Sequence, residues 1–462
     1  MGNFTKTLGN IIEKLDNLVW GPWLILLLLG TGVYLMVRLR FLPLKNLGWA
    51  LKCAFGGGGK TGKNGKISSF SALTTELATT LGTGNIVGVA TAMVLGGPGA
   101  LLWMVVTSII GMSTKLVESM LAVKYRDVNQ KGETAGGPMY TCVNALRDRK
   151  LGRKLGVCFA VFAVMASLGM GNMTQSNSIA EALLYSFGIG KAESGLFLTV
   201  LTILVVIGGI KAIGKVTQVL VPFMGVFYML GTLLVILIHW RNIPAAVAGI
   251  FAAACNPRAV SGGLFGTITV SAFESLRWGV SRGIFSNEAG LGASGITSAS
   301  ADTEDYIKQG YISMTGVFLD TVVFCTVTGL ALGVSGVVGS VDANGVPVTG
   351  TALTLNAFCS ALGGWGGSFV SVCIALFAFA TIIGWAYQGE RAFEFLMGGQ
   401  TRYNLAYRFV YGLTAYMGCV CSLEAVWNFS DICNGLMAVP NLICVLALSG
   451  EACREIKAYK GE

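Results

Sequence analysis

Long apolar runs recur along the whole chain, and short polar segments separate them. About eleven runs are long enough, or nearly so, for the ~20 residues that a helix needs to cross a bilayer. They lie near residues 18–37, 70–95, 100–123, 156–187, 196–210, 216–240, 263–299, 307–338, 367–396, 408–420 and 426–448. The pattern predicts an all-α polytopic membrane protein. Residues 44–56, 135–147 and 243–256 are expected to form short surface or re-entrant helices.

The composition agrees with the pattern. Of 462 residues, 53% are hydrophobic and only 12% are charged, and the mean hydropathy is +0.68. A soluble domain carries about twice that share of charge. The composition therefore excludes a soluble enzyme, a disordered chain and a nucleic-acid binder, despite the net charge of +9. The twelve cysteines are scattered through apolar runs and predict neither a disulfide framework nor a zinc site.

The positive charges indicate an orientation in the membrane. Most lysines and arginines fall in the segments after the first and third runs, residues 38–66 and 124–154, and in the C-terminal tail. Cytoplasmic loops carry an excess of these residues. With eleven spans, the N-terminus is expected outside and the C-terminus in the cytoplasm, in a multi-pass protein of the cell membrane.

Two runs carry glycines and polar residues at mid-membrane depth. The second run has Gly82, Gly84 and Gly88 beside threonines and an asparagine, and the seventh run has a similar cluster over residues 279–292. Glycine costs about 1 kcal/mol in a helix relative to alanine, so both clusters predict helix breaks. A break frees backbone polar groups, which need a ligand, an ion or a polar side chain in hydrocarbon.

The two breaks divide the chain into related halves. Runs two to six and runs seven to eleven each contain five spans and open with a broken helix. Because five is odd, the halves insert with opposite orientation, which is typical of an inverted-repeat transporter with its site at the breaks. The expected organisation is an N-terminal segment with the first helix (1–67), a first repeat (68–240), a second repeat (241–449) and a cytoplasmic tail (450–462).

Several motifs resemble those of a known family. G-T-G-N-I-V-G-V-A-T-A (82–92), G-G-P-G-A (96–100), R-G-I-F-S-N-E-A-G-L-G (282–292) and F-A-F-A-T-I-I-G-W-A-Y-Q-G-E (377–390) resemble the sodium:alanine/glycine symporter family. The resemblance implies a leucine-transporter-like 5+5 fold with one extra N-terminal helix. It also implies sodium-driven import of a small neutral amino acid, alanine or glycine, by alternating access. Two positions depart from it: A-S-G-I-T-S (293–298) replaces S-A-P-I-A-H, and Ala380 stands where a hydroxyl residue is expected.

A zwitterionic substrate needs a positive field and a negative field a few Å apart. The half-helix that begins near Gly84 and Asn85 offers N–H groups for a carboxylate, and freed carbonyls of both breaks suit an ammonium group or sodium. The resemblance adds Gln175 facing the substrate, and Phe285 and Trp385 as pocket walls. The substrate residues are then expected to be Thr83, Gly84, Asn85, Gln175, Phe285, Ser286 and Trp385. The co-transported sodium is expected on Thr80, Thr83 and Thr381.

Carboxylates inside the apolar runs are functional candidates because burying a charge in a membrane is costly. They are Glu76, Glu118, Glu274, Glu288 and Asp320. Arg282 and Glu288 are expected to form an ion pair that is structural or part of a gate. The sequence assigns no role to Glu76.

Other functions stay open at this point. A proton-coupled symporter, or one that carries serine or glutamine, would share the same pattern. An ion channel usually has fewer spans and no two-half pattern, and a membrane-embedded enzyme needs a catalytic constellation that the sequence does not show. The sequence does not predict the oligomeric state.

Overall fold

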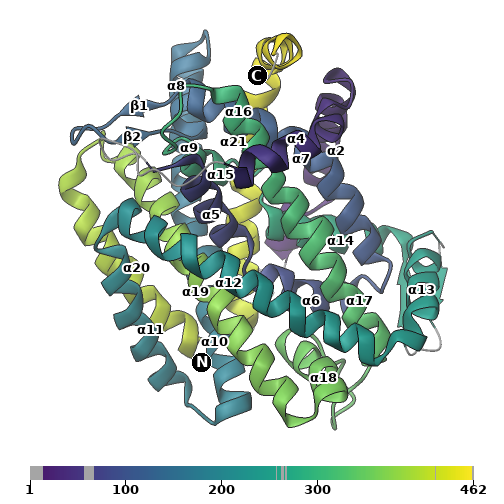
Figure 1. Cartoon of the computed structure of the whole chain (residues 1–462). Coiled ribbons are helices and arrows are strands. Elements are labelled where there is room, and N and C mark those ends of the chain that lie inside the picture. The colour runs from purple at the N-terminus through teal and green to yellow at the C-terminus, as the bar shows by residue number, and fades with distance from the viewer. Residues whose placement is uncertain are drawn as a thin grey trace.

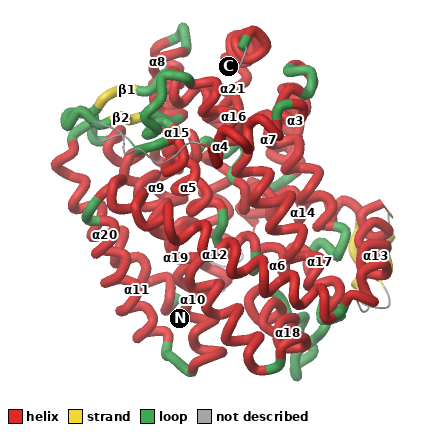
Figure 2. The backbone as a smooth tube through the Cα atoms, viewed as in Figure 1, coloured by secondary structure: helices red, strands yellow, loops and turns green. Residues whose placement is uncertain are grey.

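Helices make up almost all of this protein, and two small hairpins are its only strands among the described residues (Figure 2). The computed structural model describes residues 14–56, 67–255, 258–261, 265, 268–421 and 423–459. The α-helices in the first part of the chain are α2 (Pro22–Arg38), α3 (Leu42–Lys45), α4 (Leu47–Gly56), α5 (Ser69–Thr80), α6 (Val87–Leu95), α7 (Ala100–Lys124), α8 (Pro138–Ala145), α9 (Arg149–Leu168), α10 (Thr174–Phe187), α11 (Lys191–Val206), α12 (Gly209–Ile238) and α13 (Ile243–Cys255).

The second part continues with helices of the same kind. They are α14 (Ala272–Asn287), α15 (Ala293–Ser298), α16 (Tyr306–Val317), α17 (Thr326–Ser335), α18 (Gly350–Leu362), α19 (Gly364–Leu396), α20 (Asn404–Val420) and α21 (Leu423–Ala458). Short 3₁₀-helices are η1 (Thr83–Asn85), η3 (Trp240–Asn242) and η6 (Thr401–Tyr403), and π-helices are η2 (Gly169–Met173) and η5 (Phe318–Cys325). The hairpins pair β1 (Asp127–Val128) with β2 (Thr134–Ala135) and β3 (Arg258–Ser261) with β4 (Ile268–Ser271), both antiparallel.

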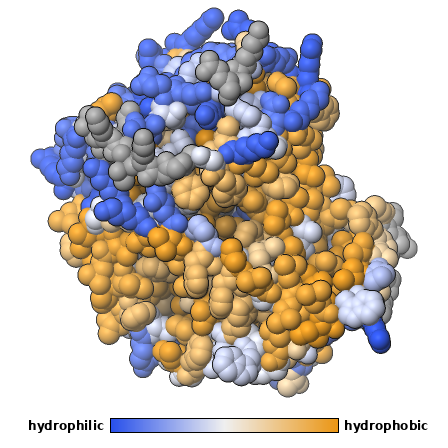
Figure 3. All heavy atoms as spheres, viewed as in Figure 1, coloured by the Kyte–Doolittle hydropathy of each residue, from blue (hydrophilic) through white to orange (hydrophobic). Residues whose placement is uncertain are grey.

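An apolar surface covers the middle of the face seen in Figure 3. Figure 3 shows a broad hydrophobic zone below a hydrophilic cap. Six helical stretches among the described residues are long and apolar enough to cross a membrane: Ala100–Lys124, Arg149–Phe187, Gly209–Ile238, Tyr306–Ser335, Gly364–Leu396 and Ser430–Ala458. The prediction of an apolar, all-α membrane protein is confirmed, whereas the count of eleven spans stays a prediction.

The helices differ in how far they are buried. In α19, 72% of the most apolar stretch is buried inside the protein, so this helix runs through the centre (Figure 1). In α12 the corresponding share is 39%, and its exposed face carries Val219, Phe223 and Leu230. A helix that exposes large apolar side chains over its length is suited to contact with lipid. The site must therefore be sought around α19 rather than α12.

The hydrophilic cap marks one end of the molecule, which we call the basic end. It carries β1, β2, α8 and the C-terminal part of α21 (Figure 1). The short helices expected at 44–56, 135–147 and 243–256 are present as α3 and α4, as α8 and as α13. The basic end contains the two loops whose lysines and arginines predict a cytoplasmic position.

Both predicted helix breaks are present. The second apolar run forms α5, η1 and α6, and the seventh forms α14 and α15 with an irregular segment between them. Helices α5 and α15 lie on the basic-end side of the breaks and pack against each other, and α15 also packs against α7. The breaks therefore lie inside the bundle, where their free backbone groups are shielded from water.

The expected orientation can be tested by labelling from each side of the membrane. Lys150 lies exposed at the basic end, and Asn344 lies exposed in the loop before α18. In a Cys255→Ser background, Asn344→Cys should react with an impermeant maleimide in intact cells, whereas Lys150→Cys should react only after permeabilisation. The physical reason is the excess of positive charge at the basic end. The reverse pattern would mean that the basic end faces outward.

Candidate functional site

The first break lies between α5 and η1. Helix α5 ends at Thr80, and the Leu81 and Gly82 backbone leaves the helical path. The side chain of Asn85 closes the gap, since its Oδ1 accepts the Gly82 N–H at 3.1 Å. The Thr83 N–H is taken by Gln175 Oε1, also at 3.1 Å. Two amide side chains thus satisfy the donors that the break exposes, as a dry interior requires.

The second break follows α14. Asn287 is the last residue of this helix, and Glu288, Gly290 and Gly292 have φ values of 57°, 89° and 83°. Glycine adopts positive φ readily, but a non-glycine residue such as Glu288 is strained there. The Lys115 ammonium donates to the Asn287 carbonyl at 3.0 Å. This buried contact holds the strained turn in place.

The two breaks meet at Gly84 and Ser286. A Cβ on Gly84 would lie 3.1 Å from the Ser286 Cα, so no side chain fits at this position without movement. Asp320 on η5 joins the two segments, because its carboxylate accepts from Asn85 Nδ2 at 2.7 Å and from Ser286 Oγ at 2.8 Å. The sequence predicts Asp320 as a candidate carboxylate inside an apolar run, but its spacing gives no sign of this bridging position.

Aromatic side chains line the region beside the breaks. Trp385 on α19 and Phe285 on α14 are both buried and belong to the same apolar cluster. Gly171 in the π-helix η2 lies directly against the Trp385 ring, and Phe285 stacks on Trp427 with ring centroids 5.2 Å apart. The structure thus brings Phe285 and Trp385 into one apolar cluster.

Oxygen atoms converge on Thr381. Its Oγ1 lies 2.9 Å from the Ala78 carbonyl of α5 and 3.1 Å from the Phe377 carbonyl of α19. Thr83 Oγ1 is buried without a hydrogen-bond partner. The hydroxyl of Thr80 contacts only carbonyls of its own helix, those of Glu76 and Leu77, both at 3.4 Å. Hydroxyl and carbonyl oxygens are the ligands of hard cations, so Thr381 has suitable neighbours and Thr80 does not.

The expected pair between Arg282 and Glu288 is wrong. Arg282 forms a buried ion pair with Asp431 on α21 and lies over the rings of Trp278, Phe285 and Trp427. Six residues separate Arg282 from Glu288, and α14 ends between them, so the two side chains leave on different faces. Arg282 borders the far side of the breaks, whereas Glu288 lies toward the basic end.

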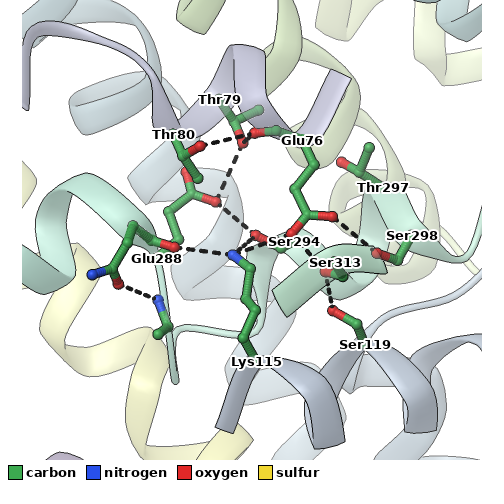
Figure 4. Close-up of polar contacts among 12 residues, drawn as sticks. Glu76, Thr79, Thr80, Lys115, Ser119, Glu288, Ser294, Thr297, Ser298 and Ser313 are labelled. Carbon is green, nitrogen blue, oxygen red and sulfur yellow. Dashed lines mark hydrogen bonds and ion pairs between the residues drawn. The ribbon is translucent and has the colours of Figure 1, made fainter. Parts of the chain in front are cut away.

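Glu288 instead joins a buried polar cluster (Figure 4). Its Oε2 accepts from Thr79 Oγ1 at 3.3 Å and from Ser294 Oγ at 3.1 Å. Ser294 also contacts the ammonium of Lys115. The hydroxyl of Ser294 belongs to the segment 293–298 that departs from the family motif, so this departure builds a polar contact rather than leaving a gap.

A cavity of about 450 Å³ opens beyond Arg282, on the side away from the basic end. It is bounded by the end of α6 and the start of α18, and its polar lining includes Glu181 and Asp431. A second cavity of about 330 Å³, between α5, α12 and η5, is lined almost entirely by apolar side chains. Of these two cavities, the first offers more polar contacts, and it borders α6 and α14, the helices that adjoin the breaks.

No cluster of three or more His, Cys, Asp or Glu side chains suited to a metal occurs in the described part of the chain. The oxygen atoms around Thr381 are of a different kind, since two of the three are backbone carbonyls. Such a set suits a monovalent cation that is bound weakly enough to be released.

Comparisons with known proteins agree with the fold. The model of the sodium:alanine symporter family matches residues 5–462. The sodium/alanine symporter AgcS of Methanococcus maripaludis is 46% identical over 97% of this chain and 97% of its own length. The probable sodium/glutamine symporter GlnT of Bacillus subtilis is 35% identical over 98% and 91%. The crystal structure of MhsT with L-phenylalanine shares the fold, with a TM-score of 0.64 and 12% identity over 87% of this chain and 94% of MhsT.

The ion pair between Arg282 and Asp431 should dominate local stability. Asp431→Asn leaves a buried arginine without a counter-charge, so unfolding should become about 3–5 kcal/mol easier. The double change Arg282→Met with Asp431→Leu should lose less, because it removes both charges. Denaturant titration in detergent measures this, with Glu181→Gln as the control that lines the same cavity. Equal losses in the single and double variants would contradict the ion-pair explanation.

Proposed function

Because this chain belongs to the sodium:alanine symporter family, we propose that it imports alanine or glycine together with sodium. The family members are transporters and not enzymes, and the fold is that of the leucine-transporter group. The single observation that supports the proposal most is the meeting of the two breaks at Gly84 and Ser286, beside the oxygen atoms around Thr381. An uptake assay in proteoliposomes, with alanine, glycine, serine and glutamine under sodium, proton or no gradient, tests it.

The substrate carboxylate is proposed to bind at the start of η1. The Thr83 N–H already bonds an oxygen, that of Gln175, so the position accepts a hydrogen-bond acceptor. A carboxylate there gains from the dipole of the half-helix. Asp320 offers carboxylate oxygens nearby for the cationic groups that enter, and it already accepts hydrogen bonds from Asn85 and Ser286. Asn85 acts mainly by holding the break and Asp320, since its side-chain atoms are used for those contacts.

Sodium is proposed to bind at Thr381 with the carbonyls of Ala78 and Phe377. The site links α5 to α19, so a bound cation would hold the half-helix of the first break against the central helix. Thr83, whose hydroxyl lacks a partner, is a second candidate ligand. The hydroxyl expected at position 380 is not required for this set, because the two carbonyls supply the oxygen atoms.

Substrate size is proposed to be set by Phe285 and Trp385. Both are buried, and Trp385 is locked by close contact with Gly171. A packed wall resists extra atoms, which favours alanine and glycine over larger substrates. The alternative, a carrier of glutamine or serine, predicts a wall that leaves more room. Proton coupling is the other alternative, and the gradient experiment separates it from sodium coupling.

Removing the hydroxyl of Thr381 should weaken the coupling to sodium. Thr381→Val should raise the sodium concentration needed for half-maximal alanine binding by about tenfold or more, a loss of about 1.4 kcal/mol. Thr381→Ser should retain wild-type behaviour. Thr80→Val is the matched control, because its hydroxyl contacts only its own helix. If Thr381→Val keeps the wild-type sodium titration, Thr381 is not a ligand.

Opening the aromatic wall should change substrate preference. Trp385→Ala, or more gently Phe285→Ala, should favour valine and leucine, since each buried methylene contributes about 0.8 kcal/mol once there is room. Alanine uptake should fall because a small substrate leaves the new space unfilled. Competition assays measure the rank order, and Trp365→Ala, at a side chain 84% exposed, is the control. An unchanged rank order in both active variants would remove these aromatics from the size limit.

A further inference from the structure

A group of buried charged side chains lies between the breaks and the basic end. We call it the Lys115 cluster, and its members are Lys115 and Glu118 on α7, Glu76 on α5 and Glu288 between α14 and α15 (Figure 4). All four are between 0% and 3% exposed. Sodium coupling as proposed above does not use them. They connect α5 and α15, the two half-helices on the basic-end side, to α7.

Lys115 has a full set of partners. Its ammonium carries three hydrogens, and it contacts the Asn287 carbonyl, Ser294 Oγ and Glu76 Oε1, the last at 3.4 Å. Glu76 is further held by Ser313 at 2.6 Å and by Ser298 at 3.1 Å. Glu76 and Lys115 therefore form a satisfied ion pair.

Glu118 and Glu288 have no such counter-charge. Glu118 Oε2 accepts from Asn441 Nδ2 at 3.0 Å, and its Oε1 is buried without a partner. Glu288 Oε1 is also buried without a partner. Neither glutamate forms an ion pair among the described residues. No neighbouring element in the described part of the chain supplies either glutamate with an ion-pair partner. The charged groups that act on Glu118 are Lys115, Glu76 and Glu288, and those that act on Glu288 are Lys115 and Glu76. On the other packed elements, α16 presents Ser313 and α21 presents Asn441, both uncharged, and Asp320 on η5 acts on Lys115.

Three carboxylates around one ammonium leave two buried negative charges if all are ionised. An isolated buried carboxylate is so costly that it takes up a proton instead. We propose that Glu118 and Glu288 each bind a proton while the basic-end side is closed, so that the Lys115 cluster is a proton-binding site distinct from the sodium site. The protons come from water at the basic end and return to it when α5 and α15 separate from α7.

The consequence is that pH at the basic end controls how readily this side opens. Raising the pH favours the state that binds fewer protons, here the open and hydrated one. Because protons enter and leave from the same side, alanine transport moves none across the membrane. The site thus regulates the carrier without changing what drives it.

A buried reporter position can test the proposal in the absence of substrate and sodium. Ala301, just after α15, is fully buried and pairs with Ile67, which precedes α5. Ala301→Cys should react with maleimide when α5 and α15 part. Dividing its rate by that of the exposed Gln130→Cys at each pH cancels the pH dependence of the thiol. The ratio should rise by up to about tenfold per pH unit for each proton released.

Glutamine substitutions test which carboxylates release the protons. Glu118→Gln and Glu288→Gln should each reduce the slope, and together they should flatten it between about pH 5.5 and about pH 9. Glu181→Gln, a carboxylate far from the cluster, should keep the wild-type slope. Thermal melting of each variant confirms that it is folded. A flat wild-type ratio, or a wild-type slope in the folded double variant, overturns the proposal. Net proton movement across the membrane during alanine uptake would contradict the claim that protons enter and leave only at the basic end. The labelling ratio does not depend on alanine transport. Failure of the proposed sodium-driven alanine import would therefore show in the uptake assay and not in this ratio.

Discussion

The interior of this protein is organised by the need to satisfy backbone groups that two broken helices expose far from water. In an unbroken helix these groups bond one another, but at a break each one requires a partner from elsewhere. Asn85 and Gln175 accept the N–H groups of the first break, and Lys115 donates to a carbonyl of the second. Two of these side chains also bind buried carboxylates, Asn85 that of Asp320 and Lys115 that of Glu76.

Three groups of buried charges lie at or beside the breaks. Arg282 and Asp431 form a closed pair beside the cavity of about 450 Å³, Asp320 bridges the two breaks, and the Lys115 cluster lies toward the basic end. Each group joins elements that are far apart in sequence. A movement of the half-helices must therefore disturb buried electrostatic contacts, which gives each step a defined energetic barrier.

Sequence patterns predicted the breaks correctly because glycine and polar residues in an apolar run conflict with an uninterrupted helix. Motifs that resemble a known family also led to Thr381, Phe285 and Trp385 as site residues, and their roles stay predictions. The partner of Arg282 was not predictable, because Asp431 lies 149 residues away on α21 and only packing brings them together. The π-helices η2 and η5, which present Gly171 and Asp320, likewise leave no clear periodic signal.

The close approach of Gly84 to Ser286 limits how this carrier can diversify. One boundary of the meeting point consists of main-chain atoms, with the Ser286 Cα only 3.1 Å from where a Cβ would lie. Main-chain atoms are common to every sequence, so substitution cannot enlarge the space in that direction. New substrate ranges can arise only through residues on the opposite boundary, where side chains differ in volume. Adaptation of such a carrier to other substrates is therefore expected to act on side chains away from this contact, such as those of the proposed aromatic wall.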